Sequence, residues 1–178
     1  MPVHPKTLTL PLLILSVAVI AAAAENAVKS AHANIANAQG TNIGTAKLTP
    51  APKGVKVVVT VSELTPGEHG IHIHNVGKCE APAFTSAGGH FNPTNAHHGI
   101  HNAQDPHPHV GDLANLVVDQ KGKAKATFII EGATLGDGTS SLFHEGGTSL
   151  VIHAKADDLM SDPSGNSGDR IACGVIEK

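Results

Sequence analysis

The chain contains neither tryptophan nor tyrosine, and apart from histidine its only aromatic side chains are Phe84, Phe91, Phe128 and Phe143. A hydrophobic core must therefore be packed from valine, isoleucine, leucine and alanine. Charged residues are also few, at 15%, and the formal net charge is −3. Because acidic residues outnumber basic ones, the sequence does not indicate the positive surface that nucleic-acid binding requires. At 178 residues it is long enough for one domain and too short for two ordinary ones.

Long apolar runs are absent except near the amino-terminal end. There, residues 8–20 are apolar at all but three positions, follow the basic Lys6 and lead into four alanines. This pattern is typical of a cleaved secretory signal, whereas a membrane anchor would need about 20 predominantly apolar residues. We predict that residues 1–24 are a signal peptide and that residues 25–178 form the mature domain. The mature protein is then expected to be periplasmic or secreted and not bound to a membrane.

Cysteine is equally scarce, with only Cys79 and Cys173 in the chain. Export would place both in an oxidising compartment, where a disulfide can persist. A bridge between them would close a loop of nearly the whole domain, worth roughly 4 to 5 kcal/mol in the chain-entropy model. Two free thiols or a two-thiol metal site are the alternatives.

Short segments rich in β-branched residues, separated by glycine, proline, asparagine and aspartate, make up most of the chain, and no segment favours a helix. The expected strands are 34–38, 43–48, 55–61, 69–74, 113–118, 124–130, 149–153 and 171–176. Eight short strands without helical crossovers favour an all-β, antiparallel sandwich or barrel. Two long segments between strands, 75–112 and 154–170, are poor in strand formers. Because long ordered loops usually carry function, the chemistry is expected there.

Histidine, in contrast, is abundant, with 13 in the chain and nine between His69 and His109. Such clustering is typical of metal binding. In the sequence GIHIH at 70–74, side chains two residues apart share one face of a strand, so His72 and His74 point the same way. Two adjacent imidazoles form a pair of metal ligands, although such pairs also occur as solvated surface residues.

The loop that follows carries further candidate ligands in the sequences GGHFNP and HVGD. Three histidines and one aspartate suit a closed tetrahedral zinc site. These candidates are His90, His98, His109 and Asp112. The alternative is a polar histidine-rich loop that binds metal nonspecifically. Three surplus histidines fit that description: His97, His101 and His107.

The order of these motifs resembles that of the copper/zinc superoxide dismutases over residues 33–178. The matching stretches, in the family's order, are HGIHIH, GKCE, TSAGGHFNP, HHG, HVGDL, GTSLVIHAKADDL and GDRIACGVI. The resemblance implies an eight-stranded antiparallel Greek-key barrel with two long functional loops. It also implies an enzyme that converts superoxide to oxygen and hydrogen peroxide.

By the same resemblance, each subunit would hold one copper and one zinc ion. The copper ligands would be His72, His74, His90 and His153. The zinc ligands would be His90, His98, His109 and Asp112. His90 would therefore bridge the two metals and exchange a proton during the reaction. Asp157, with Asp158 as the alternative, would accept hydrogen bonds from one copper and one zinc ligand. Arg170 would hold the superoxide anion by charge and hydrogen bonding.

The surplus histidines leave part of the zinc set open. His97 or His101 could replace His98, and His107 could replace His109. The spacing to the bridging histidine and the match to HVGD favour His98 and His109.

Two further points stay open in the sequence. Lys155 is a candidate for guiding the anion inward, and the chain could act alone or as a homodimer. The alternative function is a dismutase-like domain that stores metal without turnover, which the surplus histidines would suit. Against it, no copper ligand and no anion-binding arginine is missing.

Overall fold

The structure is a computed structural model that describes residues 1–2, 28–104 and 107–178. Nearly all of the predicted signal peptide lies outside these residues. The described part of the chain is built of strands, with one short 3-10 helix, η1 (Thr85–Ala87), which confirms the predicted all-β class. Among the described residues, no helix has the length and apolar character needed to cross a bilayer.

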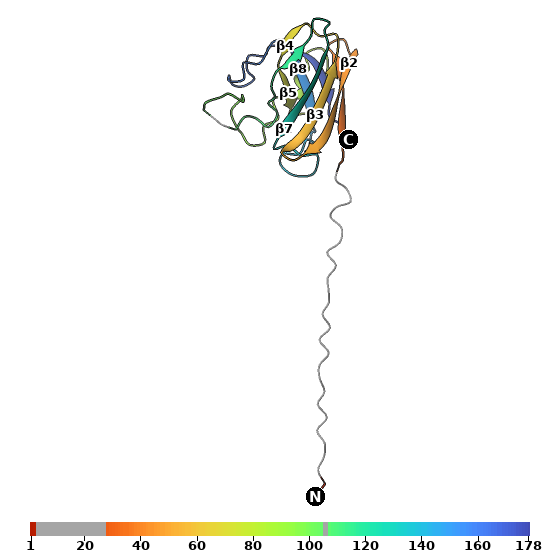
Figure 1. Cartoon of the computed structure of the whole chain (residues 1–178), viewed down its shortest axis with the longest axis vertical. Coiled ribbons are helices and arrows are strands. Elements are labelled where there is room, and N and C mark those ends of the chain that lie inside the picture. The colour runs from red at the N-terminus through yellow and green to blue at the C-terminus, as the bar shows by residue number, and fades with distance from the viewer. Residues whose placement is uncertain (3–27, 105–106) are drawn as a thin grey trace.

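Nine strands make up the body of the molecule (Figure 1). They are β1 (Ala31–Asn37), β2 (Asn42–Ala51), β3 (Gly54–Val61), β4 (Gly67–His69), β5 (Ile71–His74), β6 (Leu116–Val118), β7 (Ala124–Glu131), β8 (Ser149–His153) and β9 (Arg170–Val175). Seven form one antiparallel sheet in the order β5-β8-β9-β1-β2-β3-β7, while β4 pairs with β6. The last strand returns to pair with the first, so the strands nearest the two ends of the described domain lie side by side in the sheet.

The core is aliphatic, as the composition requires. Along β3, Val55, Val57 and Val59 are fully buried while Lys56 and Thr60 are exposed. Because successive side chains of a strand point to opposite faces, this alternation presents one valine face to the core. The paired strands β2 and β7 fix its register on both sides.

Strands β5 and β8 are buried on both faces. Their inward side chains, such as Ile71, Ile73 and Ile152, join the core. The outward face is buried as well because the loops that follow β5 and β8 cover it. In Figure 1 these loops, in green and blue, lie on the same side of the sheet. The polar outward side chains of β5 and β8 are thus enclosed between sheet and loops.

Several strand boundaries differ from the sequence prediction, and only β8 has the expected limits. The expected strand 69–74 is divided at Gly70, whose N–H bonds to Lys155 O (2.8 Å) and whose carbonyl accepts the N–H of His153 (2.8 Å). This division raises the number of strands to nine. The first strand begins three residues earlier than expected, at Ala31, and the expected strand 113–118 is ordered as a strand only from Leu116.

Candidate metal centre

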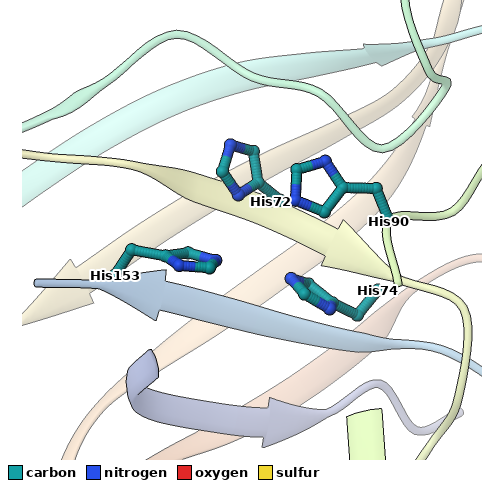
Figure 2. A group of neighbouring side chains, drawn as sticks. All are labelled: His72, His74, His90 and His153. Atoms are coloured by element: carbon teal, nitrogen blue, oxygen red, sulfur yellow. The ribbon is translucent and has the colours of Figure 1, made fainter. Parts of the chain in front are cut away.

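Three histidines reach the enclosed outward face from paired strands. His72 and His74 alternate with the core isoleucines of β5, and His153 ends the neighbouring strand β8. A fourth, His90, comes from the loop after β5. That loop runs along the free edge of β5, where the N–H of Phe91 bonds to Ile73 O (2.8 Å). Figure 2 shows the four rings facing a common centre.

A second loop segment pairs with the same edge of β5. The N–H of Ile73 donates to Gly111 O (2.9 Å), and the N–H of Gly111 donates to Phe91 O (2.8 Å). A Cβ atom at Gly111 would lie 2.2 Å from Ile73 O, so this approach admits only glycine. The glycine of HVGD therefore lets Asp112 reach the loop histidines.

Each of the four converging rings has one nitrogen anchored and one without a partner. The anchored atoms are Nε2 of His72 to Asp157 Oδ2 (2.6 Å), Nδ1 of His74 to Gly88 O (2.9 Å), Nδ1 of His90 to Asp112 Oδ1 (2.8 Å) and Nδ1 of His153 to Gly168 O (3.1 Å). The buried atoms that lack any hydrogen-bond partner are Nδ1 of His72 and Nε2 of His74, His90 and His153. These inward-facing atoms fit a bound cation, because buried polar groups are otherwise nearly always paired.

One more buried side-chain nitrogen in the described part of the chain lacks a partner, Nε2 of His144. Its ring stacks on Phe91 with centroids 5.4 Å apart and is not part of either ligand group. The four converging histidines differ from His144 because their ligand atoms lie within 4.8 Å of one another.

A second group of donors adjoins the first and shares His90 with it. The Nδ1 atoms of His90, His98 and His109 lie 2.8, 3.0 and 3.2 Å from Oδ1 of Asp112. All four side chains are buried, and their donor atoms lie within 4.8 Å of one another. Three imidazoles and one carboxylate suit tetrahedral zinc.

Asp157 joins the two groups. Its Oδ2 accepts from Nε2 of His72 (2.6 Å) and its Oδ1 from Nε2 of His98 (3.1 Å), and its side chain is fully buried. Asp158, the alternative from the sequence, is exposed and bonds to its own turn. The geometry favours Asp157 as the connecting carboxylate.

The pKa values of the buried histidines and aspartates depend on burial, which favours the neutral form, and on neighbouring charges, which favour the ionised form of some of them. Burial lowers the pKa of His72 to about 3 and of His153 to about 4, and it also lowers the pKa of His74 and His90. For His98, burial opposes the charged form, but hydrogen bonds to Asp112 and Asp157 outweigh it and raise the pKa to about 9. Burial likewise opposes ionisation of Asp112 and Asp157, yet their imidazole donors lower both pKa values far below the usual range. At neutral pH the first group is uncharged and the carboxylates are ionised.

Arg170 begins β9 beside the first group. Its guanidinium donates to Phe84 O (2.7 Å) and Gly88 O (2.6 Å), and it borders a surface cavity of about 550 Å³. Among the described residues no carboxylate lies within ion-pair distance of it. The predicted disulfide Cys79–Cys173 is confirmed, and it ties the loop that holds these two carbonyls to β9.

The surplus histidines lie outside both groups. His97 is about half exposed and its Nδ1 lies 2.7 Å from Asp162 Oδ2, while His101 and His107 are exposed. The structure therefore brings His98 and His109, and not their alternatives, to Asp112. Lys155 is exposed, and its side chain lies near Gly168.

Two residues near the site were missed in the sequence. His69 is buried, with Nδ1 2.7 Å from His153 O and Nε2 2.9 Å from Thr65 O. The sign in the sequence that could have identified it is the third histidine at the start of HGIHIH. Asp162, which contacts the zinc-type loop, had no sequence pattern that distinguished it.

Comparison with known proteins supports the resemblance. A family model described as copper/zinc superoxide dismutase (SODC) matches residues 42–176. The protein named superoxide dismutase (Cu-Zn) 1 of Aquifex aeolicus is 47% identical over 148 residues, which cover 82% of this chain and 86% of that protein. Superoxide dismutase (Cu-Zn) of Deinococcus radiodurans is 36% identical over 182 residues, covering 97% of each.

Solved structures agree with the sequence comparison. The crystal structure of a SOD-like protein from Bacillus subtilis superposes with a TM-score of 0.77 at 36% identity, covering 81% of this chain and 96% of that chain. The Cu/Zn superoxide dismutase from Brucella abortus gives a TM-score of 0.66 at 30% identity, covering 84% and 100%.

Proposed function

The chain belongs to the copper/zinc superoxide dismutase family, and from this premise we propose which of its side chains convert superoxide to oxygen and hydrogen peroxide. Copper and zinc are the cofactors and superoxide is the substrate. The observation that carries the proposal is the set of four buried imidazole nitrogens that face one another without a hydrogen-bond partner. They need a cation between them.

We assign copper to the group formed by His72, His74, His90 and His153, and zinc to the group formed by His90, His98, His109 and Asp112. The chemistry that bound copper supplies is one-electron transfer in both directions, which zinc cannot provide. His90 would belong to both groups, because its Nε2 is among the unpartnered nitrogens of the first group and its Nδ1 lies 2.8 Å from Asp112 Oδ1 in the second. Because burial lowers the pKa of all four proposed copper ligands, they are neutral and offer free lone pairs at neutral pH.

His90 has a second role in the proposal, as the group that moves a proton. Its Nδ1 is held at the Asp112 side, so the proton is taken up and released at Nε2, which faces the open centre. The product peroxide needs two protons, and Nε2 of His90 delivers one of them where the product forms.

Arg170 binds the substrate anion. Two of its N–H groups are used by Phe84 O and Gly88 O, which fixes the plane of the guanidinium. Arg170 lines the cavity, and its remaining N–H groups can hold superoxide by charge and hydrogen bonding. Its positive charge also adds to burial in keeping the pKa of His74 and His153 low.

We further propose that the mature protein acts outside the cytoplasm, as a periplasmic or secreted enzyme. The support is the apolar run at residues 8–20 and the disulfide Cys79–Cys173, which persists best in an oxidising compartment. Whether it works as a monomer or as a homodimer is decided by its molecular mass in solution.

The test is reconstitution of the purified mature protein with copper and zinc, followed by an assay of superoxide removal. His153→Ala is expected to lose copper and nearly all activity. Arg170→Ala is expected to keep copper and lose activity by about 100-fold, the usual scale for removing a group that stabilises developing charge. Arg170→Lys, which keeps the charge but not the planar fork, should have an activity between those of the wild type and Arg170→Ala.

The competing function, metal storage without turnover, makes the opposite prediction. Wild-type protein that holds both metals yet removes superoxide no faster than the metal-free protein would decide for storage.

A further inference from the structure

Asp162 holds two neighbouring histidines of the loop that carries the zinc-type ligands. Its Oδ1 accepts the backbone N–H of His98 (2.7 Å), and its Oδ2 lies 2.7 Å from Nδ1 of His97. One carboxylate thus contacts the main chain of a proposed zinc ligand and the side chain of the residue before it. His97 is one of the surplus histidines that neither metal group includes.

His98 is consequently fixed from two sides. Its ring is fully buried, with Nδ1 at Asp112 and Nε2 at Asp157. The backbone of His98 is held as well, because its N–H donates to Asp162 Oδ1. The backbone contact therefore adds a third restraint to a ring that is already held at both nitrogens.

The contact with Asp162 belongs to a docked pair of loops. The N–H of His101 donates to Leu159 O (3.0 Å), and Nδ2 of Asn102 donates to Met160 O (3.1 Å). A Cβ atom on Gly99 would lie 2.3 Å from Leu159 O, so the two chains are in close contact. Asp162 adds one more hydrogen bond between the two loops, at His98, the residue before Gly99.

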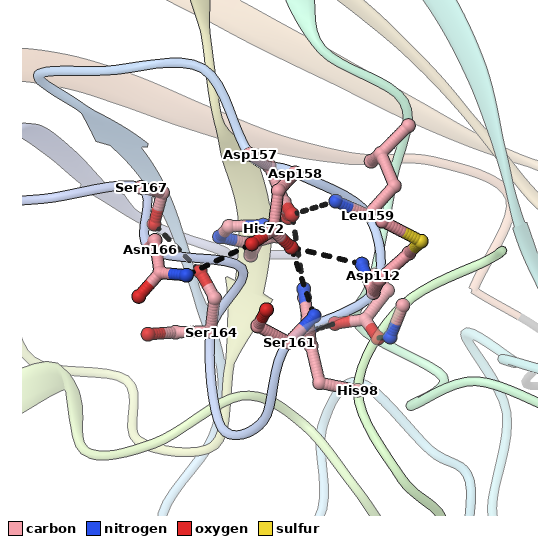
Figure 3. Close-up of polar contacts among 12 residues, drawn as sticks. His72, His98, Asp112, Asp157, Asp158, Leu159, Ser161, Ser164, Asn166 and Ser167 are labelled. Atoms are coloured by element: carbon pink, nitrogen blue, oxygen red, sulfur yellow. Dashed lines mark hydrogen bonds and ion pairs between the residues drawn. The ribbon is translucent and has the colours of Figure 1, made fainter. Parts of the chain in front are cut away.

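The turn that carries Asp162 is itself braced (Figure 3). Asp158 Oδ1 accepts the N–H groups of Met160 (3.0 Å) and Ser161 (2.8 Å), and its Oδ2 accepts from Asn166 Nδ2 (2.9 Å). The N–H of Asp158 bonds to Gly165 O (2.8 Å) and the N–H of Gly165 to Ser161 O (2.7 Å). A closed turn of this kind presents the Asp162 carboxylate in one position.

We propose that Asp162 is a positioning residue which, together with His97, clamps the zinc-binding loop and slows the release of zinc. The inference rests on the proposed zinc ligands. It gives His97 a structural task, which is to hold the second oxygen of the Asp162 carboxylate.

The test measures zinc release from the mature protein loaded with both metals, using a coloured chelator in excess. Asp162→Ala removes both contacts and is expected to release zinc about tenfold faster, as is usual when a group that orients a ligand is lost. His97→Ala removes one of the two contacts of Asp162 and should have a smaller effect. Asp162→Asn keeps an oxygen for the N–H of His98 and should stay closer to wild type.

Asp119→Ala is the matched control. Asp119 also accepts two backbone N–H groups of its own turn, from Lys121 (2.8 Å) and Lys123 (2.9 Å), but it lies between β6 and β7, away from the zinc ligands. Thermal unfolding of the metal-free Asp162→Ala and Asp119→Ala proteins should show similar losses. Faster zinc release should be confined to Asp162→Ala.

The outcomes separate the clamp from the proposed function. Wild-type protein that retains one zinc ion per chain, with Asp162→Ala releasing it at the wild-type rate, overturns the clamp and leaves the function intact. Zinc release that rises equally in Asp119→Ala also overturns it, because the effect would then be general loosening. Wild-type protein without tightly bound zinc overturns the zinc ligands and the clamp together.

Discussion

The buried histidines fall into two electrostatic kinds, although they lie within one centre. His72 and His153 are kept neutral by burial, whereas His98 is kept protonated by two ionised aspartates. Because a metal binds the neutral imidazole, the first kind is ready for a cation and the second must lose a proton first. The two metal groups should therefore respond differently to pH.

Zinc binding to the metal-free protein is expected to release about one proton at pH 7, since His98, with a pKa of about 9, is then protonated. A raised pKa means that the proton is held below pH 9, so zinc affinity should fall as the pH drops from 9 to 7. Calorimetry of zinc binding in two buffers that differ in ionisation enthalpy measures this release. The release should shrink in Asp157→Asn, which removes one of the charges that raise the pKa; equal heats in both buffers would contradict the prediction.

At the scale of single residues, part of the site is predictable from the sequence. The common direction of His72 and His74 follows from the two-residue period of a strand, and the structure shows it. The spacing to His90 favours His98 over His97 but does not require it, because neighbouring residues in an irregular loop can point either way. The structure selects His98 through contacts with three aspartates elsewhere in the chain. Asp112 and Asp157 contact its buried ring, and Asp162 accepts its backbone N–H.

At the scale of elements, the loops and not the strands complete the centre. Strands β5 and β8 supply three histidines, while the loop after β5 brings His90 and the carbonyls that fix Arg170. The disulfide Cys79–Cys173 ties that loop to β9. The position of the arginine thus depends on a covalent link to a distant strand.

Replacing both cysteines, Cys79→Ser with Cys173→Ser, is expected to lower the free energy of unfolding of the metal-free protein by about 4 kcal/mol, because the bridge closes a long loop. Urea unfolding followed by circular dichroism measures this. The superoxide rate of the metal-loaded variant should fall too, since the acceptors of Arg170 lose their tether. An unchanged unfolding midpoint would show that the bridge stabilises nothing.

The division of the expected strand 69–74 could not be predicted from its sequence. Its alternation is continuous, but Gly70 is paired with the loop after β8, and a Cβ atom there would lie 2.8 Å from the Cβ of Ser167. The partner that breaks the strand is nearly a hundred residues away in the chain. Local periodicity contains no information about such a neighbour.

For the molecule as a whole, the barrel core and the metal groups are separate sources of stability. The core is packed from aliphatic side chains such as Val57, Leu48 and Ile35, none of which belongs to a metal group. The all-β class was predictable because these residues alternate along short strands. The pairing of β9 with β1 was not, since it joins the two ends of the domain.

Chelation of both metals should therefore leave the sheet folded and lower only its stability. With free zinc at a thousand times its dissociation constant, bound zinc contributes about 4 kcal/mol, so its removal should lower the Tm by about 10 °C. Far-ultraviolet circular dichroism at 25 °C should be almost the same before and after chelation. Loss of the β-sheet spectrum on chelation would mean that the metals are needed for folding itself.

The disulfide also matters for an enzyme whose product is hydrogen peroxide. Peroxide attacks free thiols and can carry them to irreversibly oxidised acids. Here the only two sulfhydryl groups are joined to each other, so the chain carries none for its own product to damage. Apart from Met1, the remaining sulfur is the exposed thioether of Met160, whose sulfoxide is reducible by repair enzymes.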